Sequence, residues 1–354
     1  MATVGTYTIA DLMAIKFQSV KAFGLNTIAE VVNKELALHN ELVTDMVSSL
    51  CEVTTDAQRI YGTSLDGTMF KVDEFGRAPS VKQDFGDTVG FPLERFQYAL
   101  GWTQDWFEKK TPADLAVAIR NAEMAHKREL VAQIKKALFY SANYSIRDYL
   151  VDYVSLNVKR LANADGGKIP NGPYGVVFDG STHTHYLGAA SLDATALRSL
   201  IATIMEHGYG SDIKVAFNYA DEATVRAVTG FIPYLDSRIV TPASTRDVLN
   251  QPLNNQDIYD RAIGLFEGAE IIIKPWVPQY YAFAAAYGEP AKPLCFRQQN
   301  ATTLQGLRIP ATFEAFPLHA EYMQAEFGVG VWTRTNGAVL KFNNATYSDP
   351  TINS

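Results

Sequence analysis

The sequence predicts an α+β protein whose structural parts are discontinuous along the chain. Three observations lead to this class. Apolar residues recur at helical spacing over residues 27–50, and a helix start at Thr111 opens a second, longer helical segment. Strand-like runs dominate roughly the last ninety of the 354 residues. A chain of this length can bury a substantial core.

The composition excludes several classes of protein. The formal net charge is −7, from 31 Lys and Arg against 38 Asp and Glu, which is the wrong sign for gripping a phosphate backbone through counterion release. Cys51 and Cys295 lie outside any CxxC pattern, so both are expected to be reduced, buried thiols.

No targeting or membrane segment is predicted. The first residues contain Asp11 and lack a basic start followed by an apolar core, so they do not form a secretion signal. The longest apolar run, from Tyr280 to Tyr287, is too short to cross a bilayer. We therefore expect a soluble protein that is intracellular when made and has no membrane partner.

The first predicted part, residues 1–53, is an N-terminal arm followed by an amphipathic helix. The helix covers 27–50, where apolar residues fall on one stripe and charged residues lie elsewhere. The stripe consists of Ile28, Val31, Val32, Leu38, Leu42, Val43, Met46 and Leu50. It is expected to be the buried face of the helix.

The second part, residues 54–107, has the pattern of a long two-stranded excursion. Turn signals such as Asp66-Gly67 and Phe75-Gly76 interrupt short extended runs, and apolar residues alternate at period two from Phe96 to Trp102. A lone two-stranded hairpin is only marginally stable in water. The excursion is therefore predicted to need a partner surface.

The third part, residues 108–150, contains the clearest local signal. Thr111 has the role of N-cap, Pro112 takes the first helical position, and Asp114 lies near the third, as in a capping box. This start predicts a long helix with one buried face.

The remainder changes from α/β to mainly β. Residues 151–300 are predicted to form an α/β part, with a helix from Leu192 to His207 that Gly208 stops, a strand at Ile213 to Asn218 and a helix at Asp221 to Thr229. The strand-like runs near the end are Glu270 to Ile273, Tyr280 to Ala286, Leu307 to Phe316, Tyr322 to Trp332 and Ala338 to Phe342.

Two stretches carry a resemblance to a known family. These are GAEIIIKPWVPQYYAFAAA at 268–286 and AEFGVGVWTRTNGAVLKFNN at 325–344. In the second, Phe327, Val329 and Val331 share one face, whereas Gly328 and Gly330 let another backbone approach closely. With the order of the elements, these stretches resemble the Hong Kong 97 type major capsid protein of tailed phages.

The resemblance implies a fold with an N-arm, an extended E-loop hairpin, a long spine helix, an α/β A-domain and a β-rich P-domain. The corresponding ranges are 1–53 for the N-arm and its helix, 54–107 for the E-loop, 108–150 for the spine helix and the first part of the P-domain, 151–300 for the A-domain and 301–354 for the second part of the P-domain.

The function that this resemblance implies is structural, without catalysis or a cofactor. Many copies, as hexamers and pentamers, would build an icosahedral virion shell around double-stranded DNA, assembled in the host cytoplasm with possible scaffold, portal and decoration proteins. The excursion would lie over an adjacent subunit, because its apolar residues would be costly on a monomer. The residues predicted to form this interface are Met69, Phe70, Phe75, Arg77, Lys82, Asp84, Phe85, Asp87 and Phe91.

Some members of the family cross-link their subunits, and this reaction is not expected here. It joins an E-loop lysine to a P-domain asparagine and is promoted by a glutamate. Lys71 or Lys82 lies in the right excursion and Asn343 or Asn344 near the right end, but no glutamate follows Glu326 to act as the nearby base.

Two alternatives remain open. One is an encapsulin, a compartment of the same fold that holds enzyme cargo, although the length of the excursion favours the viral shell. The other is a soluble α/β metal-dependent hydrolase that uses His183 and His185, which would share one face of a strand. The sequence places no third ligand, so a hydrogen-bonded pair is favoured and no metal site is predicted. The histidines expected to be isolated are His39, His126, His207 and His319.

Overall fold

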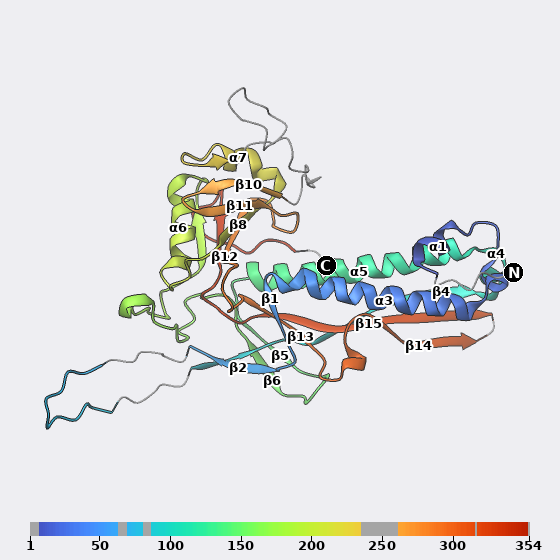
Figure 1. The fold of residues 1–354 in the computed structure, drawn as a ribbon, viewed down its shortest axis with the longest axis horizontal. Coiled ribbons are helices and arrows are strands. Elements are labelled where there is room, and N and C mark those ends of the chain that lie inside the picture. The colour runs from blue at the N-terminus through green and yellow to red at the C-terminus, as the bar shows by residue number, and fades with distance from the viewer. Residues whose placement is uncertain (1–6, 63–68, 81–85, 235–260, 316, 353–354) are drawn as a thin grey trace.

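The computed structural model describes residues 7–62, 69–80, 86–234, 261–315 and 317–352. Two long helices lie side by side over a long sheet, and a second sheet with its own helices stands at one end of them (Figure 1). The predicted mixture of helices and strands is confirmed.

The first sheet has five strands and is built from both ends of the chain. Its long strand β15 pairs with β13 over its last residues, with β14 over its first residues, and with β4 along most of its length. The strands are β1 (Cys51–Thr54), β4 (Glu94–Thr103), β13 (Leu294–Gln298), β14 (Arg308–Ala315) and β15 (Leu318–Val331). Within it, Cys51 and Cys295 are buried free thiols, as predicted.

The long helix α5 (Pro112–Phe139) begins where the sequence predicts. The backbone N–H of Thr111 donates to the Asp114 carboxylate at 3.0 Å, and this bond lowers the pKa of Asp114. Pro112 occupies the first turn, where its missing N–H costs nothing. The predicted capping box is therefore confirmed.

The second long helix, α3 (Leu25–Ser48), also confirms its predicted range, and it packs along α5. The shorter helices α1 (Ile9–Ala14) and α2 (Val20–Phe23) fold back onto these two long helices and onto α4 (Gln104–Lys109). Ile9, Leu12 and Val20 are buried there. Residues 9–23 therefore bury apolar side chains within their own subunit.

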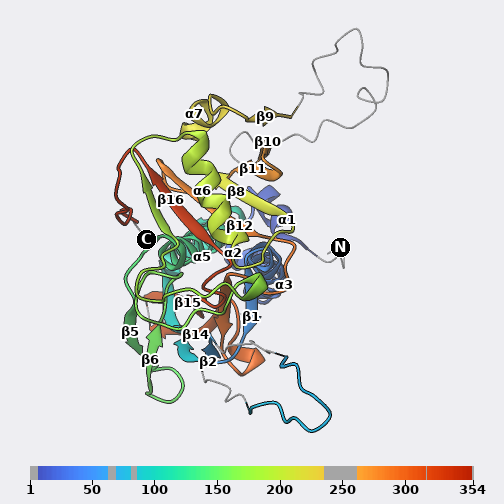
Figure 2. The same cartoon turned by 90° about the vertical axis from the view of Figure 1, so that its left-hand side faces the viewer.

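The second sheet has seven strands, and α6 (Ala194–Met205) packs against two of them, β12 and β16. Figure 2 shows α6 in front of this sheet. The strand order is β7 (Tyr186–Ala189), β16 (Ala338–Phe342), β12 (Tyr281–Ala286), β8 (Ile213–Phe217), β11 (Ala269–Ile273), β10 (Arg261–Phe266) and β9 (Ile232–Pro233). The helix α7 (Glu222–Arg226) follows β8. The predicted helices and strands of this region are confirmed to within a few residues.

The two sheets divide the chain differently from the predicted ranges. Strand β13 lies within 151–300 but belongs to the five-stranded sheet, and β16 lies within 301–354 but belongs to the seven-stranded sheet. Strand pairing is a long-range property, so a boundary placed at one position along the chain does not capture it.

Two small hairpins complete the fold. They are β2 (Gln58–Tyr61) with β3 (Asp87–Gly90), and β5 (Tyr144–Arg147) with β6 (Ser155–Val158). Because β4 belongs to the five-stranded sheet, the predicted excursion of 54–107 is shorter than expected and emerges between β2 and β3.

Short 3-10 helices lie at Pro173–Gly175, Tyr219–Asp221 and Thr302–Leu304. Within the described ranges, no helix combines the length and apolarity needed to cross a membrane.

A buried ion pair anchors both hairpins to the large sheet. Arg297 on β13 donates to the Asp148 carboxylate at 2.6 Å and to the backbone carbonyl of Phe91 at 2.8 Å. Both charged side chains are almost fully buried. A buried charge is tolerated only when it is paired and hydrogen-bonded, so this pair fixes the root of the excursion on a rigid support.

A buried histidine pair joins the two long helices and predicts a pH effect on stability. His39 and His126 contact each other at 2.9 Å, and burial lowers the pKa of each to about 4. Free histidine titrates near pH 6.5. Between these values the unfolded chain binds more protons, so the free energy of unfolding should fall as the pH drops from about 6.5 towards 4, by about 1.4 kcal/mol per pH unit for each proton.

Denaturant unfolding at pH 7 and pH 5 tests this expectation. The double variant His39→Leu/His126→Leu should lose less stability than the wild-type chain over this interval, since it retains every other titrating group. An equal loss in both proteins would show that the pair does not contribute.

Candidate assembly surface

Residues 69–80, the described part of the segment between β2 and β3, project from the body of the subunit (Figures 1 and 2). All of them are exposed. The exposed fraction is 98% for Met69, 88% for Phe75 and 44% for Phe70. The segment turns at Asp73, whose side chain accepts the Phe75 N–H at 3.1 Å and whose carbonyl accepts the Gly76 N–H at 3.2 Å. The turn predicted at Phe75-Gly76 is therefore present.

The predicted interface residues fall into three groups. Met69, Phe70, Phe75 and Arg77 lie on the projecting segment and are exposed. The second group, which lies outside the described residues, consists of Lys82, Asp84 and Phe85. The third group, Asp87 and Phe91, lies at the root of the segment and contacts its own chain.

The two root residues correct the prediction. Phe91 is fully buried and its ring lies 6.1 Å from that of Trp332, so it offers no surface to another subunit. The Asp87 carboxylate is half-buried and accepts the Lys168 backbone N–H at 3.0 Å. The sequence pattern includes both residues in the excursion, because it does not show where the projecting part ends.

A second apolar surface was missed from the sequence. Leu38, Leu42 and Met46 follow one another at helical spacing on α3, with exposed fractions of 51%, 52% and 43%. The helical pattern of residues 27–50 predicts all three on one buried stripe with Ile28 and Val43. In the structure the buried stripe runs through the neighbouring positions, including Leu36 and Val47. The helix is therefore apolar over a wider arc than its own subunit covers.

A third exposed apolar group lies on the β5–β6 hairpin. Tyr149 and Tyr153 are 63% and 62% exposed, and Val151 and Val154 lie beside them in the turn. Tyr153 adopts a φ of 62°, an uncommon backbone conformation for a bulky residue. The projecting segment, the α3 stripe and this turn are three separate apolar surfaces on one subunit.

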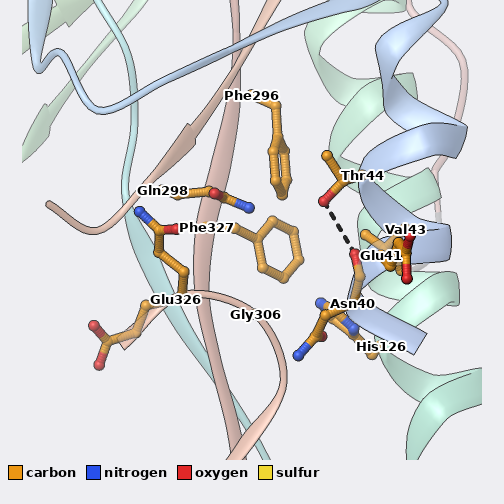
Figure 3. Close-up of a pocket in the computed structure, with 11 residues that line it drawn as sticks. Asn40, Glu41, Val43, Thr44, His126, Phe296, Gln298, Gly306, Glu326 and Phe327 are labelled. Atoms are coloured by element: carbon orange, nitrogen blue, oxygen red, sulfur yellow. Dashed lines mark hydrogen bonds between the residues drawn. The ribbon is translucent and has the colours of Figure 1, made fainter. Parts of the chain in front are cut away.

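A cavity of about 210 Å³ lies between α3 and the five-stranded sheet, where Figure 3 shows Phe296 and Phe327 opposite Asn40 and Thr44. The Asn40 side chain binds both backbone groups of Leu307, donating at 3.1 Å and accepting at 2.8 Å. These bonds hold the loop before β14 against α3. The cavity is therefore a seam between packed elements of one subunit.

The carboxylate at the edge of this cavity is buried. The side chain of Glu326 is only 2% exposed. It accepts from Arg95 at 2.9 Å, from Gln299 at 2.8 Å and from Gln324 at 2.6 Å. These bonds cross-brace β4 and β15 within one subunit.

The structure brings His183 and His185 together with a third histidine. Their Nε2 atoms lie 3.0 Å apart, and each lies 3.0 Å from Nε2 of His207, which follows α6. Glu206 joins the group on its exposed side. His207 was expected to be isolated, and this expectation is wrong. Burial lowers the pKa of all three imidazoles, so they are neutral near pH 7.

Comparison with known proteins gives a result at the level of structure. No family model and no curated protein matches the sequence. A chain from a structure of Mycobacterium phage Patience is similar over 99% of this chain and 97% of its own, with 22% identity and a TM-score of 0.68. A chain of the cyanophage A-1(L) capsid asymmetric unit matches over 84% and 92%, with 11% identity and a TM-score of 0.50.

At such low sequence identity, the structural similarity establishes a shared fold and nothing more detailed. The agreement with the phage Patience chain extends over nearly the whole length of both chains, so the fold is shared as a unit. The chain therefore has the fold of phage capsid proteins, as its resemblance to the Hong Kong 97 type predicted.

Proposed function

We propose that this chain is a major capsid protein whose copies assemble into a closed icosahedral phage shell around double-stranded DNA. The observation that supports this most directly is the projecting segment 69–80, whose apolar side chains are all exposed, with Met69 and Phe75 exposed almost completely. A soluble monomer rarely exposes such residues without a binding role. The capsid fold supplies the partner, namely a second copy of the chain.

The three apolar surfaces fit this form of assembly. They lie on different elements, so a contact between the segment of one copy and a different surface of the next is heterologous. Heterologous contacts close into rings when the rotation between subunits permits it. Many modest contacts in a closed shell reinforce each other. On this proposal the segment acts as the E-loop, α5 as the spine helix, and the seven-stranded region forms the hexamer and pentamer centres.

The proposed role is structural rather than enzymatic. The net charge of −7 keeps the wall from adhering to the packaged DNA. Binding to DNA is then unspecific and weak, and no cofactor takes part. Scaffold, portal and decoration proteins are the expected additional partners.

Electron microscopy of the expressed protein, combined with nuclease protection, tests this function. We expect hollow icosahedral particles from the chain with its assembly partners, and particles from the native source should contain nuclease-resistant double-stranded DNA. Particles that carry a protein cargo and no DNA would instead identify an encapsulin-like compartment. A protein that stays small at every concentration tested would contradict both functions.

A further inference from the structure

We propose that His183, His185 and His207 bind one Zn²⁺ ion per chain, with the Glu206 carboxylate as the fourth ligand. This inference is independent of the shell function, since its four residues flank β7 and α6 of the seven-stranded region and none of them belongs to the projecting segment. Its chemical basis is a ligand set of three imidazole nitrogens and one carboxylate oxygen, which is a typical donor set for tetrahedral zinc.

The first argument is the convergence of the three rings. The three Nε2 atoms form a triangle with sides of 3.0 Å, whereas the ring centroids lie 5.0 Å apart. The rings therefore point their Nε2 atoms at a common point. The centre of such a triangle is about 1.7 Å from each nitrogen, so an ion about 1 Å above the plane has the Zn–N distance of about 2.0 Å.

The second argument concerns hydrogen atoms. The Nδ1 of His185 lies 2.6 Å from the carbonyl oxygen of Gly337. A carbonyl can only accept, so Nδ1 carries the hydrogen and Nε2 of the neutral ring presents a lone pair. A metal-binding histidine is usually oriented in this way by a backbone carbonyl. His185 is fully buried, so this tautomer is fixed by the fold.

A cluster held by hydrogen bonds alone fits the geometry less well. Three nitrogens that face one point have room for one hydrogen between them, and that hydrogen cannot serve all three contacts at good angles. The lone pairs left over then face each other at 3.0 Å. A cation at the common point satisfies all three nitrogens together.

The surroundings complete the coordination and close the site. An oxygen of Glu206 lies 3.6 Å from Nε2 of His183 and 4.0 Å from Nε2 of His207. Its side chain is 41% exposed, so it has the freedom to move the short distance to an ion. The ring of Phe178 packs against two of the imidazoles, with centroid distances of 4.8 Å to His183 and 4.2 Å to His207. Four ligands indicate a structural rather than a catalytic ion.

The ion would join segments that are far apart in the sequence. His183 and His185 precede β7, His207 follows α6, and Gly337 precedes β16. Strand β7 is an edge strand of the seven-stranded sheet. The ion would therefore fasten this edge to the end of α6 and stabilise the folded subunit by binding it in preference to the unfolded chain.

Metal analysis and thermal unfolding of the purified chain test the site. After chelation and dialysis, we expect one Zn²⁺ per chain on reloading and a rise in Tm of about 5 °C or more at saturating Zn²⁺. Co²⁺ in place of Zn²⁺ should give the visible absorption of a tetrahedral ion. This readout on the wild-type chain does not depend on whether a variant folds.

Variants locate the ion. His183→Ala and His207→Ala should lose stoichiometric Zn²⁺, the Co²⁺ absorption and the Tm rise, with secondary structure unchanged by circular dichroism. The matched control is His319→Ala, because the His319 side chain is 15% exposed like that of His183 and also lies near carboxylates. The control should bind one Zn²⁺ as before. Failure of the wild-type chain to take up Zn²⁺, or equal uptake by the His183→Ala and His207→Ala variants, would overturn the proposal.

Discussion

Replacing residues 69–80 with a short Gly-Ser linker is expected to abolish closed particles and to leave the subunit folded. The replaced residues are exposed, so their removal costs the subunit little buried area. Strands β2 and β3 on either side of the segment pair with each other, and the linker keeps them joined. Sedimentation and electron microscopy should therefore show small, folded species in place of shells.

Two further variants keep the full length of the segment and test whether its apolar side chains are needed for assembly. Met69→Ser/Phe75→Ser removes the two most exposed apolar side chains of the segment, which are 98% and 88% exposed. It should reduce particle yield at least about tenfold, because a buried Phe and Met contribute roughly 1.5 to 3 kcal/mol each at every copy of the contact. The matched control Ala78→Ser, in the same segment, should assemble normally. Normal shells from the linker variant would contradict the role assigned to the segment.

Gly328→Ala is expected to lower the free energy of unfolding of the subunit by about 3 kcal/mol or more. A Cβ at this position of β15 would lie 2.1 Å from the carbonyl oxygen of Pro92. That oxygen belongs to the backbone that enters β4, and Gly328 also pairs with Arg297 of β13. The clash cannot be relieved by rotating a side chain, so the strands must separate.

The control for this variant lies in the same sheet. A Cβ at Gly101 of β4 would meet no atom within 4 Å, and an alanine there should change stability by less than about 1 kcal/mol. Denaturant unfolding of both variants is best measured in the linker background, so that particle formation does not mask subunit stability. Equal stability of the two variants would show that the backbone approach at Gly328 is not tight.

Local signals in the sequence predicted much of the fold. The capping box at Thr111, the stop at Gly208 and the period-two pattern from Phe96 to Trp102 are each determined by residues a few positions apart, and each is found in the structure. The close approach predicted at the glycines of β15 is also confirmed. Glycine inside a strand leaves room that a second backbone can fill, so this prediction needed only the local pattern.

The remaining features depend on contacts between distant residues. The exposure of Leu38 and Leu42 is decided by which arc of α3 faces α5 and the sheet, and a helical repeat alone does not specify that rotation. His207 lies 22 residues after His185, and only the packing of α6 brings them together. The extent of the projecting segment follows from the pairing of β4 with β15. The position of His207 at the end of a predicted helix is only a weak signal that it joins His183 and His185.

The measurement that tests the proposed assembly most directly is the mass of the purified chain in solution by multi-angle light scattering, in wild-type and linker forms. If the exposed surfaces are contacts between copies, the wild-type protein forms particles of many subunits and the linker variant falls to single chains or small oligomers. A wild-type protein with the mass of one chain, about 39.1 kDa, under all assembly conditions would contradict it.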